Sequence, residues 1–217
     1  MKKTFLILLL LAGTALFGNV IFIKAPTVAG GGTTITDNFN RADSELSVSP
    51  SAEGWSWVNA ITNTLSIATN ELKNSGSNQT AEYYADSSLG GPDMEVEVTL
   101  TNEFLTSTSD LKLGARWTDT DNNYHFKRSH NTNDFRLYRR VSGTNTQIGS
   151  AYAADPTPPY TVKIVVDGDQ ISGYVNGVLR CGPVTDTSIT TGNYSAIRLF
   201  SNGASLLTVD DFTASSL

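Results

Sequence analysis

The run L-K-L-G-A-R-W at residues 111–117 opens the part of the chain that decides its fold. Three similar runs follow: N-Y-H-F-K-R-S at 123–129, D-F-R-L-Y-R-R-V at 134–141 and T-V-K-I-V-V-D-G-D-Q-I-S-G-Y-V-N-G at 161–177. Each run is short, rich in β-branched and aromatic residues, and closed by Asn, Asp or Gly. This is the pattern of β-strands joined by tight turns. The stretch therefore predicts an all-β fold.

Alternation along these runs assigns their side chains to two faces, because successive residues of a strand point to opposite sides. In the first run the predicted apolar face carries Leu111, Leu113, Ala115 and Trp117. In the second and third runs the opposite, polar face carries His125, Lys127, Arg136, Tyr138 and Arg140. Residues 94–101 alternate in the same way, which predicts another strand with one buried face.

Turn chemistry predicts how the strands connect. Asp167-Gly168-Asp169 joins two strands as a hairpin, and Asn176-Gly177 is the dipeptide preferred by a type I′ turn. About a dozen short strands in one open sheet would expose long edges, so two packed sheets are expected. We therefore predict a two-sheet antiparallel β-sandwich of the jelly-roll type, and no helix after residue 36.

The N-terminus has the features of a targeting segment. Lys2 and Lys3 precede an apolar stretch that extends to Ile23. Residues 1–29 fit a signal peptide cleaved after Ala15 or Ala29, and residues 4–23 alternatively fit a retained membrane anchor. We favour export with cleavage. Residues 30–36 are predicted to be a flexible linker and residues 37–217 the folded domain, located outside the cytoplasm as a secreted, cell-surface or periplasmic protein.

Charge and cysteine content exclude several classes of function. The formal net charge is −6, and removal of the first 29 residues leaves 12 basic against 21 acidic residues. Such an acidic domain is a poor general ligand for nucleic acid. Cys181 is the only cysteine, so the chain forms no intramolecular disulfide and assembles no thiolate metal site. We expect Cys181 to pack as a small apolar residue.

Four segments carry a resemblance to a known superfamily: F-N-R-A-D from residue 39, A-R-W-T-D-T-D-N-N-Y-H-F from 115, Y-T-V-K-I-V-V-D-G-D-Q-I-S-G-Y-V-N-G-V-L from 160, and V-D-D-F from 209. Together they resemble the concanavalin A-like, laminin-G-like jelly-roll superfamily over residues 37–212. The resemblance implies a fold rather than one activity. The superfamily includes lectins, adhesion modules, carbohydrate-binding modules and glycan-cleaving enzymes.

The chain lacks a complete catalytic motif. Glu95 and Glu97 share a strand face, but the third acidic position of the E-x-D-x-x-E strand used by hydrolases of this superfamily is Leu100. Arg136, His125 and Tyr138 could belong to a lyase-type set, yet the surrounding lyase motifs are missing. We therefore predict that the protein is not an enzyme and that Glu95 and Glu97 form a solvated face.

Two groups of oxygen-bearing side chains are candidate calcium ligands, because Ca²⁺ binds carboxylate and amide oxygens. One is the loop with Asp119, Asp121 and Asn122. The other pairs Asp37 with Asp210 or Asp211, on the condition that the first and last strands are neighbours. The alternative is that these residues cap turns through hydrogen bonds to their own backbone.

Basic residues concentrate in one part of the acidic domain. Seven of its 12 basic residues lie between Lys112 and Arg140, interleaved with aromatic side chains. Rings stack on sugar faces and arginine binds carboxylate or sulfate groups in pairs. The candidate ligand-binding residues are His125, Lys127, Arg136, Tyr138, Arg140 and Trp117. An ordinary solvated sheet face is the alternative interpretation.

These observations predict an exported carbohydrate-binding or adhesion module whose partner is an acidic or neutral glycan. A structural calcium ion is the one candidate cofactor, with turn capping as the alternative role of its ligands, and no other cofactor is expected. The protein's only contact with a membrane would be through the N-terminal segment. A structural or adhesive surface protein that binds other proteins is the second hypothesis, and a glycan hydrolase or lyase is the third.

Overall fold

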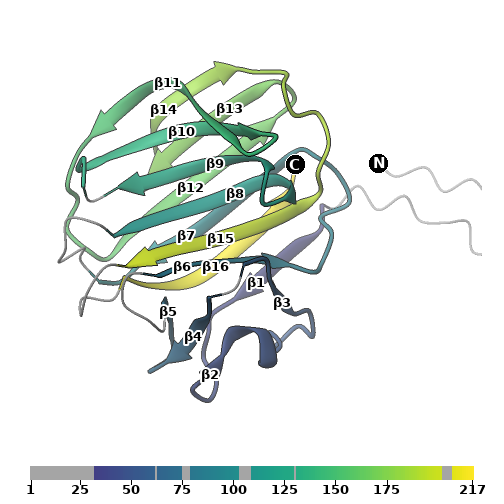
Figure 1. Cartoon of the computed structure of the whole chain (residues 1–217), viewed down its shortest axis with the longest axis vertical. Helices are drawn as coiled ribbons and strands as arrows, with labels where there is room; N and C mark the ends of the chain where they lie inside the picture. Colours follow the sequence, from purple (N-terminus) through teal and green to yellow (C-terminus); the bar gives the residue numbers. More distant parts are fainter. Residues whose placement is uncertain (1–31, 62, 75–78, 103–108, 130, 202–206) are drawn as a thin grey trace, which may run out of the picture. The chain divides into compact units, whose positions relative to one another are not determined.

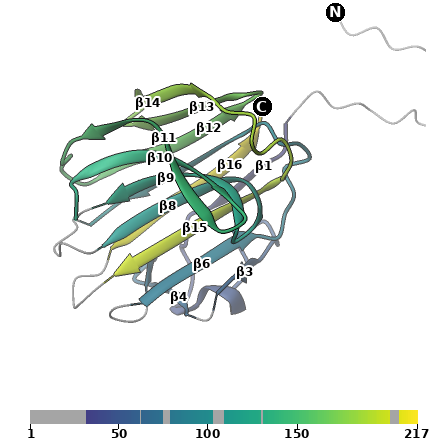
Figure 2. The same cartoon turned by 45° about the horizontal axis from the view of Figure 1, so that its top comes forward.

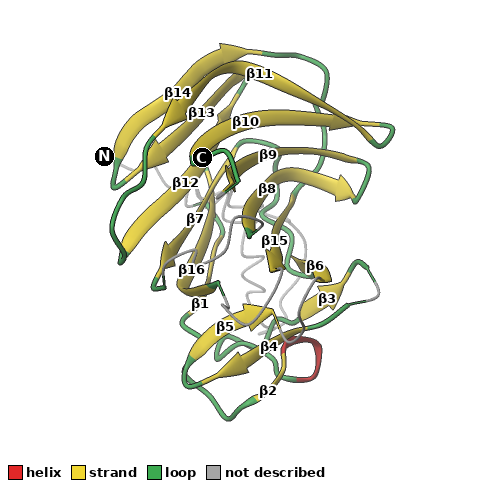
Figure 3. Ribbon diagram, turned by 60° about the vertical axis from the view of Figure 1, so that its left-hand side comes forward, coloured by secondary structure: helices red, strands yellow, loops and turns green. Residues whose placement is uncertain are grey.

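A computed structural model describes residues 32–61, 63–74, 79–102, 109–129, 131–201 and 207–217. Residues 31–217 form one compact unit, and the predicted targeting segment lies outside the described residues. Within the described residues the strands form two antiparallel sheets, one of nine strands and one of seven, and a single 3-10 turn spans Leu46–Val48. Figure 3 shows the sheets as two layers. The predicted β-sandwich is confirmed.

The nine-stranded sheet contains, in spatial order, β14 (Val178–Thr185), β13 (Gln170–Val175), β12 (Tyr160–Asp167), β7 (Met94–Leu100), β16 (Thr208–Ser216), β5 (Glu71–Asn74), β4 (Leu65–Ala68) and β2 (Ser44–Glu45), with β1 (Thr34–Asp37) also paired to β16. The seven-stranded sheet contains β11 (Thr144–Ala153), β10 (Asp134–Val141), β9 (Asn122–Ser129), β8 (Asp110–Asp119), β15 (Tyr194–Ser201), β6 (Gln79–Ala85) and β3 (Trp57–Asn59). Its central strands lie in front in Figure 1 and can be followed from another angle in Figure 2.

The core lies between the two sheets and is built from alternate residues of each strand. The predicted apolar face of β7 is fully buried at Met94, Val96, Val98 and Leu100. Facing it across the core, β8 buries Leu111, Leu113 and Ala115. Each large apolar side chain buried in this way contributes roughly 1.5–3 kcal/mol. The period of two seen in the sequence therefore identifies the core.

The two predicted hairpin turns are present. β12 and β13 pair from Val162↔Val175 to Asp167↔Gln170, so the chain reverses at Gly168 and Asp169. Asn176 and Gly177 both have positive φ, 50° and 71°, as a type I′ turn requires at its two central residues.

The predicted position of Trp117 in the core is wrong. β8 contains an irregularity between Ala115 and Asp119, and Arg116 has a φ of 46°. Against β15 the irregularity gives β8 three steps, from Gly114 to Trp117, where its partner has two, so this β-bulge adds one residue and shifts the alternation. Arg116 consequently points toward the nine-stranded sheet, where its guanidinium donates to the carbonyls of Pro92 and Ile189. Trp117 packs on the outer face of the seven-stranded sheet.

The predicted linker also needs a correction. Residues 34–36 belong to β1, whose backbone pairs with β16, and Ile35 is buried. The sequence T-I-T-D at 34–37 alternates polar and apolar residues, as a strand does. Because it directly follows a run of glycines, its composition resembles that of a linker. The sheet therefore begins at Thr34 rather than at Asp37. No helix among the described residues is long and apolar enough to cross a membrane.

Candidate functional site

Strand register arranges the outer face of the seven-stranded sheet in transverse rows. Side chains that are direct partners on neighbouring strands line up across the sheet. The central row runs over five strands through Tyr138, His125, Gly114, Ala196 and Tyr84. Gly114 and Ala196 have small side chains, whereas the other three members carry rings. The row therefore has a depression at Gly114 and Ala196, with a ring on each side of it.

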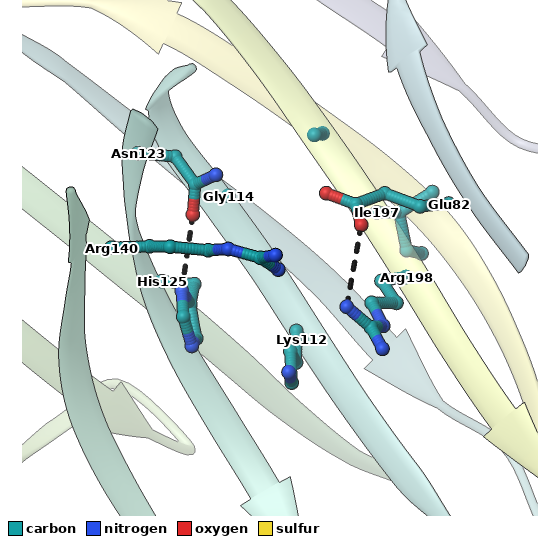
Figure 4. Close-up of a pocket in the computed structure, with 9 residues that line it drawn as sticks. Glu82, Lys112, Gly114, Asn123, His125, Arg140, Ile197 and Arg198 are labelled. Carbon is teal, nitrogen blue, oxygen red and sulfur yellow. Dashed lines mark hydrogen bonds and ion pairs between the residues drawn. The ribbon is translucent and has the colours of Figure 1, made fainter. Parts of the chain in front are cut away.

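We call this depression the central hollow. Its floor is Gly114 and Ala196, and its sides are formed by Glu82, Lys112, Asn123, His125, Arg140 and Arg198 (Figure 4). The cavity volume is about 10 Å³, which is room for one water-sized group. The hollow therefore fits a substituent of a larger molecule rather than an entire sugar ring.

His125 lies beside Gly114, where its side chain is buried, and hydrogen bonds hold its ring in one orientation. Its Nδ1 lies 3.1 Å from Oδ1 of Asn123, while the amide nitrogen of Asn123 donates to the carbonyl of Asp119 at 3.1 Å. That donation fixes the orientation of the Asn123 amide, so its oxygen faces His125. The oxygen accepts a hydrogen bond from the Nδ1–H of His125. The other ring nitrogen, Nε2, is left as a hydrogen-bond acceptor.

Burial and nearby cations keep His125 neutral. Burial lowers its pKa well below the usual 6.5, and the charges of Lys112, Arg198, Arg140 and Lys127 lower it further. The pKa of Lys112 is also lowered, to about 8, first by burial and then by Arg198 and Lys127, although Asp110 and Glu82 oppose the shift. At neutral pH the hollow therefore combines a neutral imidazole with cationic neighbours.

Aromatic pairs flank the hollow on both sides. Tyr138 stacks on His125 with ring centroids 5.2 Å apart and an interplanar angle of 16°. On the other side Tyr84 stacks on Trp117 at 4.4 Å and 18°, and the indole Nε1 of Trp117 donates to Glu82 at 3.3 Å. β10 and β6 are four strand spacings apart, or about 19 Å. Trp117 and His125 are buried, so an elongated ligand laid across the strands would contact the pairs through their half-buried members, Tyr84 and Tyr138.

All six predicted ligand-binding residues lie on this outer face. His125 and Arg140 line the central hollow, and Tyr138 and Trp117 belong to the flanking aromatic pairs. The remaining two take part in ion pairs, Lys127 with Asp110 at 2.9 Å and Arg136 with Asp134.

Sequence reasoning missed three charged residues of the hollow. The alternation of residues 111–117 predicts the polar face for Lys112, but the candidate ligand-binding residues do not include it. Glu82 and Arg198 come from β6 and β15, far away along the chain. The signal that could have found them was the alternation within those two strands. Assigning them to the hollow required knowledge of the strand order.

The segment that follows β11 does not line the central hollow. The backbone N–H of Ala154 donates to Asn133, and Asp155 forms an ion pair with Arg128 at 2.6 Å. These contacts hold the segment beside the ends of β9 and β10. None of residues 151–159, all of which the structure describes, lines the hollow.

The candidate calcium ligands Asp119, Asp121 and Asn122 form a hydrogen-bonded turn. Asp119 accepts the N–H of Asp121 at 2.7 Å and the amide of Asn122 at 3.0 Å. Asp121 pairs with Arg140 at 3.1 Å, and the amide oxygen of Asn122 accepts the N–H of Ser142. Donors thus occupy positions where a cation would need oxygens, and as it stands the loop does not fit a calcium ion.

The second candidate group does not fit one either. The condition of adjacency holds, since β1 pairs with β16. However, both carboxylate oxygens of Asp37 bind Arg41, and one also accepts the indole N–H of Trp57 at 2.8 Å. Asp210 and Asp211 lie at an irregularity of β16, where Asp210 accepts the N–H of Asp211. Among the described residues no three His, Cys, Asp or Glu side chains group to hold a metal.

The paired glutamates of β7 lie on the other sheet, away from the central hollow. Glu95 forms an ion pair with Lys163 of β12 at 3.0 Å, and Leu100 is buried in the core. Burial raises the pKa of Glu97, and Lys163 opposes the shift. Cys181 is buried, and burial raises the pKa of its thiol to about 11, so it behaves as an apolar residue.

No protein-family model matches the sequence, and a search of curated proteins finds no relative. Solved structures do share the fold. The carbohydrate-binding module CBM66 from Bacillus subtilis superposes with a TM-score of 0.58 at 15% identity, over 71% of this chain and 91% of that module. The carbohydrate recognition domain of Emp47p gives 0.61 at 10% identity, over 87% and 98%. The exoplasmic/lumenal domain of VIP36, in a form bound to Ca²⁺ and Man3GlcNAc, gives 0.57 at 9% identity, over 75% and 83%. The chain therefore has a jelly-roll fold of the lectin type.

Proposed function

We propose that this protein is an exported carbohydrate-binding module that binds a glycan across the outer face of its seven-stranded sheet. The observation that carries the proposal is the central row, in which two aromatic pairs flank a polar hollow. Rings provide surfaces for the apolar faces of sugars, and the hollow supplies donors and an acceptor for polar substituents. The carbohydrate-binding structures that share the fold support the same class of ligand.

The experiment is binding of the folded domain to a polysaccharide panel, read by retention in affinity gels and by titration calorimetry. The double variant Tyr138→Ala/Arg136→Ala should lose retention, since it removes a stacking ring and a cation from the face. The matched control is Tyr174→Ala/Lys163→Ala on the nine-stranded sheet, where Lys163 lies 5.4 Å from the ring of Tyr174. Its retention should match that of the wild type.

Two other hypotheses predict different outcomes. A structural or adhesive protein would ignore the panel and appear in assemblies with other proteins. A glycan lyase or hydrolase would release unsaturated products or reducing sugars, and Glu95→Gln or Glu97→Gln would abolish hydrolysis. Equal loss of retention in the face variant and the control variant would contradict the proposed site.

Calcium stays a prediction for this chain. VIP36 is a Ca²⁺-bound neighbour, but binding at Asp119, Asp121 and Asn122 here would require those side chains to give up their present hydrogen bonds. If a structural ion is held, EDTA should lower the melting temperature and added Ca²⁺ should restore it. A melting temperature unchanged by EDTA rejects the hypothesis.

A further inference from the structure

A second transverse row, next to the central row, consists mostly of cations. Direct partners on successive strands are Arg136, Lys127, Lys112, Arg198 and Glu82. We call the first four the basic row. Like charges placed directly opposite each other on neighbouring strands destabilise a sheet. Four cations in sequence across four strands therefore need compensation from nearby acids.

Among the described residues, three of the four cations of the basic row have a carboxylate partner, and Lys112 is the exception. Arg136 binds Asp134, Lys127 binds Asp110 at 2.9 Å, and Arg198 lies 3.5 Å from Glu82. Within the described part of the chain, the side-chain ammonium of Lys112 has no carboxylate within ion-pair distance and no hydrogen-bond partner. Lys112 is also the member of the row that lies beside Gly114, at the floor of the central hollow.

Arg140 adds a further unsatisfied donor to the same place. Its side chain extends toward the middle of the hollow (Figure 4). One terminal nitrogen pairs with Asp121, but Nε is buried and lacks a hydrogen-bond partner among the described residues. Buried donors without partners are unfavourable unless something else satisfies them. The hollow thus gathers an unpaired ammonium and an unpaired guanidinium N–H around space for one small group.

We propose that the central hollow binds the anionic substituent, a carboxylate or a sulfate ester, of an acidic polysaccharide, with Lys112, Arg140 and Arg198 as its donors. This inference rests on the proposed function and names its substrate class. The anion would supply the ion-pair partner that the ammonium of Lys112 lacks among the described residues. The sugar ring that carries it would remain above the hollow, beside the aromatic pairs.

Neutral His125 suits this arrangement. A protonated imidazole would add one more cation to the hollow, whereas the neutral ring offers Nε2 to a hydroxyl next to the anionic group. Glu82 restricts the position of the anion, because its carboxylate holds Arg198 and Trp117 at one side. The ligand charge is therefore expected nearest to Lys112 and Arg140.

The test compares acidic polysaccharides with their neutralised forms on the folded domain. The probes are alginate, polygalacturonate, hyaluronate and chondroitin sulfate, each beside its carboxyl-reduced form and, for the last, its desulfated form. At least one acidic probe should be retained, and its neutralised form should bind about tenfold more weakly or worse. The reduced and desulfated forms distinguish a carboxylate ligand from a sulfate ligand.

Protein variants separate a specific site from general attraction of charges. Lys112→Met should weaken binding of the retained acidic probe about tenfold or more, and Lys112→Arg, which keeps the charge, should recover part of it. Lys163→Met, on the other sheet, should leave binding unchanged. If Lys112→Met and Lys163→Met lose equal affinity, the attraction is nonspecific and the inference is overturned.

A pH series gives an independent measurement. Lys112 is faced by Lys127, Arg198, Arg140 and His125, and on the other side by Asp110 and Glu82. With a pKa of about 8 in the free protein, Lys112 loses its charge as the pH rises above 8, so affinity for the acidic probe should fall there. Lys112→Met should abolish this dependence.

The two proposals fail in different ways. If neutral polysaccharides are retained and charge on the polysaccharide has no effect, the inference about the hollow is overturned while carbohydrate binding stands. If neither acidic nor neutral polysaccharides are retained, the proposed function itself fails.

Discussion

Lys112 is a residue whose charge weakens the folded state, although it lies at the central hollow. It is surrounded by cations and is partly buried, and its pKa is lowered to about 8. Because the folded state disfavours the charged form, Lys112 lowers the free energy of unfolding wherever it is protonated. Residues that weaken a fold without an evident structural benefit are typical of functional sites.

Lys112→Met should therefore stabilise the free protein. Below pH 8 we expect the free energy of unfolding to rise by about 0.5–1 kcal/mol, since two cross-strand like-charge contacts are removed. The unfolded chain binds the proton more tightly than the folded chain, so wild-type stability increases between pH 8 and about 10.5 and the advantage of the variant shrinks. Urea unfolding at pH 7 and pH 10 measures both effects. A variant less stable than the wild type at pH 7 would contradict this account.

For a single residue, the sequence predicts which face of the sheet the side chain lies on better than it predicts which charges surround that side chain. Alternation placed His125, Tyr138 and Arg140 correctly on the outer face, because a strand has a fixed period of two. It could not show that the ammonium of Lys112 has no ion-pair partner among the described residues, since that depends on Arg198 and Glu82 from strands distant along the chain. Charge compensation belongs to the folded sheet and not to any one strand.

Among the individual elements, β8 departs most from its sequence pattern. The bulge at Arg116 reverses the faces of Arg116 and Trp117, and it brings Trp117 to Tyr84 on the outer face of the seven-stranded sheet. Gly114 borders the irregularity and is the one local signal of a bulge, but the alternation of L-K-L-G-A-R-W otherwise indicates a regular strand. The bulge is held by long-range contacts of the arginine side chain, which the sequence does not reveal.

Arg116→Met tests this role of the arginine. The variant keeps an unbranched stem but leaves the carbonyls of Pro92 and Ile189 without the guanidinium donor, and Asp93 loses its ion pair while it still accepts the N–H of Gly168. We expect a loss of about 3 kcal/mol in the free energy of unfolding, measured by urea denaturation. Arg180→Met on exposed β14 is the control, with an expected change below about 1 kcal/mol. A change in Arg116→Met no larger than that of the control would show that the bulge forms without this side chain.

For the molecule as a whole, the sandwich was predictable and its strand order was not. Short alternating strands with tight turns restrict an all-β chain to packed sheets. The sequence did not show that β15 inserts between β8 and β6, and this insertion brings Ala196 and Arg198 into the central hollow. Pairing between distant strands is set by the packing of the entire core.

Export remains a prediction for the full chain, because residues 1–31 lie outside the described residues. The positive charges before an apolar stretch predict that the mature protein lacks the N-terminal segment. Mass spectrometry of the protein recovered from its native compartment should show a chain that begins after Ala15 or after Ala29. A mass that includes residues 4–23 would indicate a retained anchor instead.

The transverse rows exist in one strand register only. A slip of β9 by two residues along β8 would keep every apolar side chain in the core, because the side-chain period is two. It would, however, move Lys127 into the place of His125 beside Gly114. The turn at Asp119–Asn122, closed by side-chain hydrogen bonds, prevents that slip. A short polar turn at the margin of the sheet thereby fixes the strand register, and the register determines which chemical groups meet at the centre of the sheet.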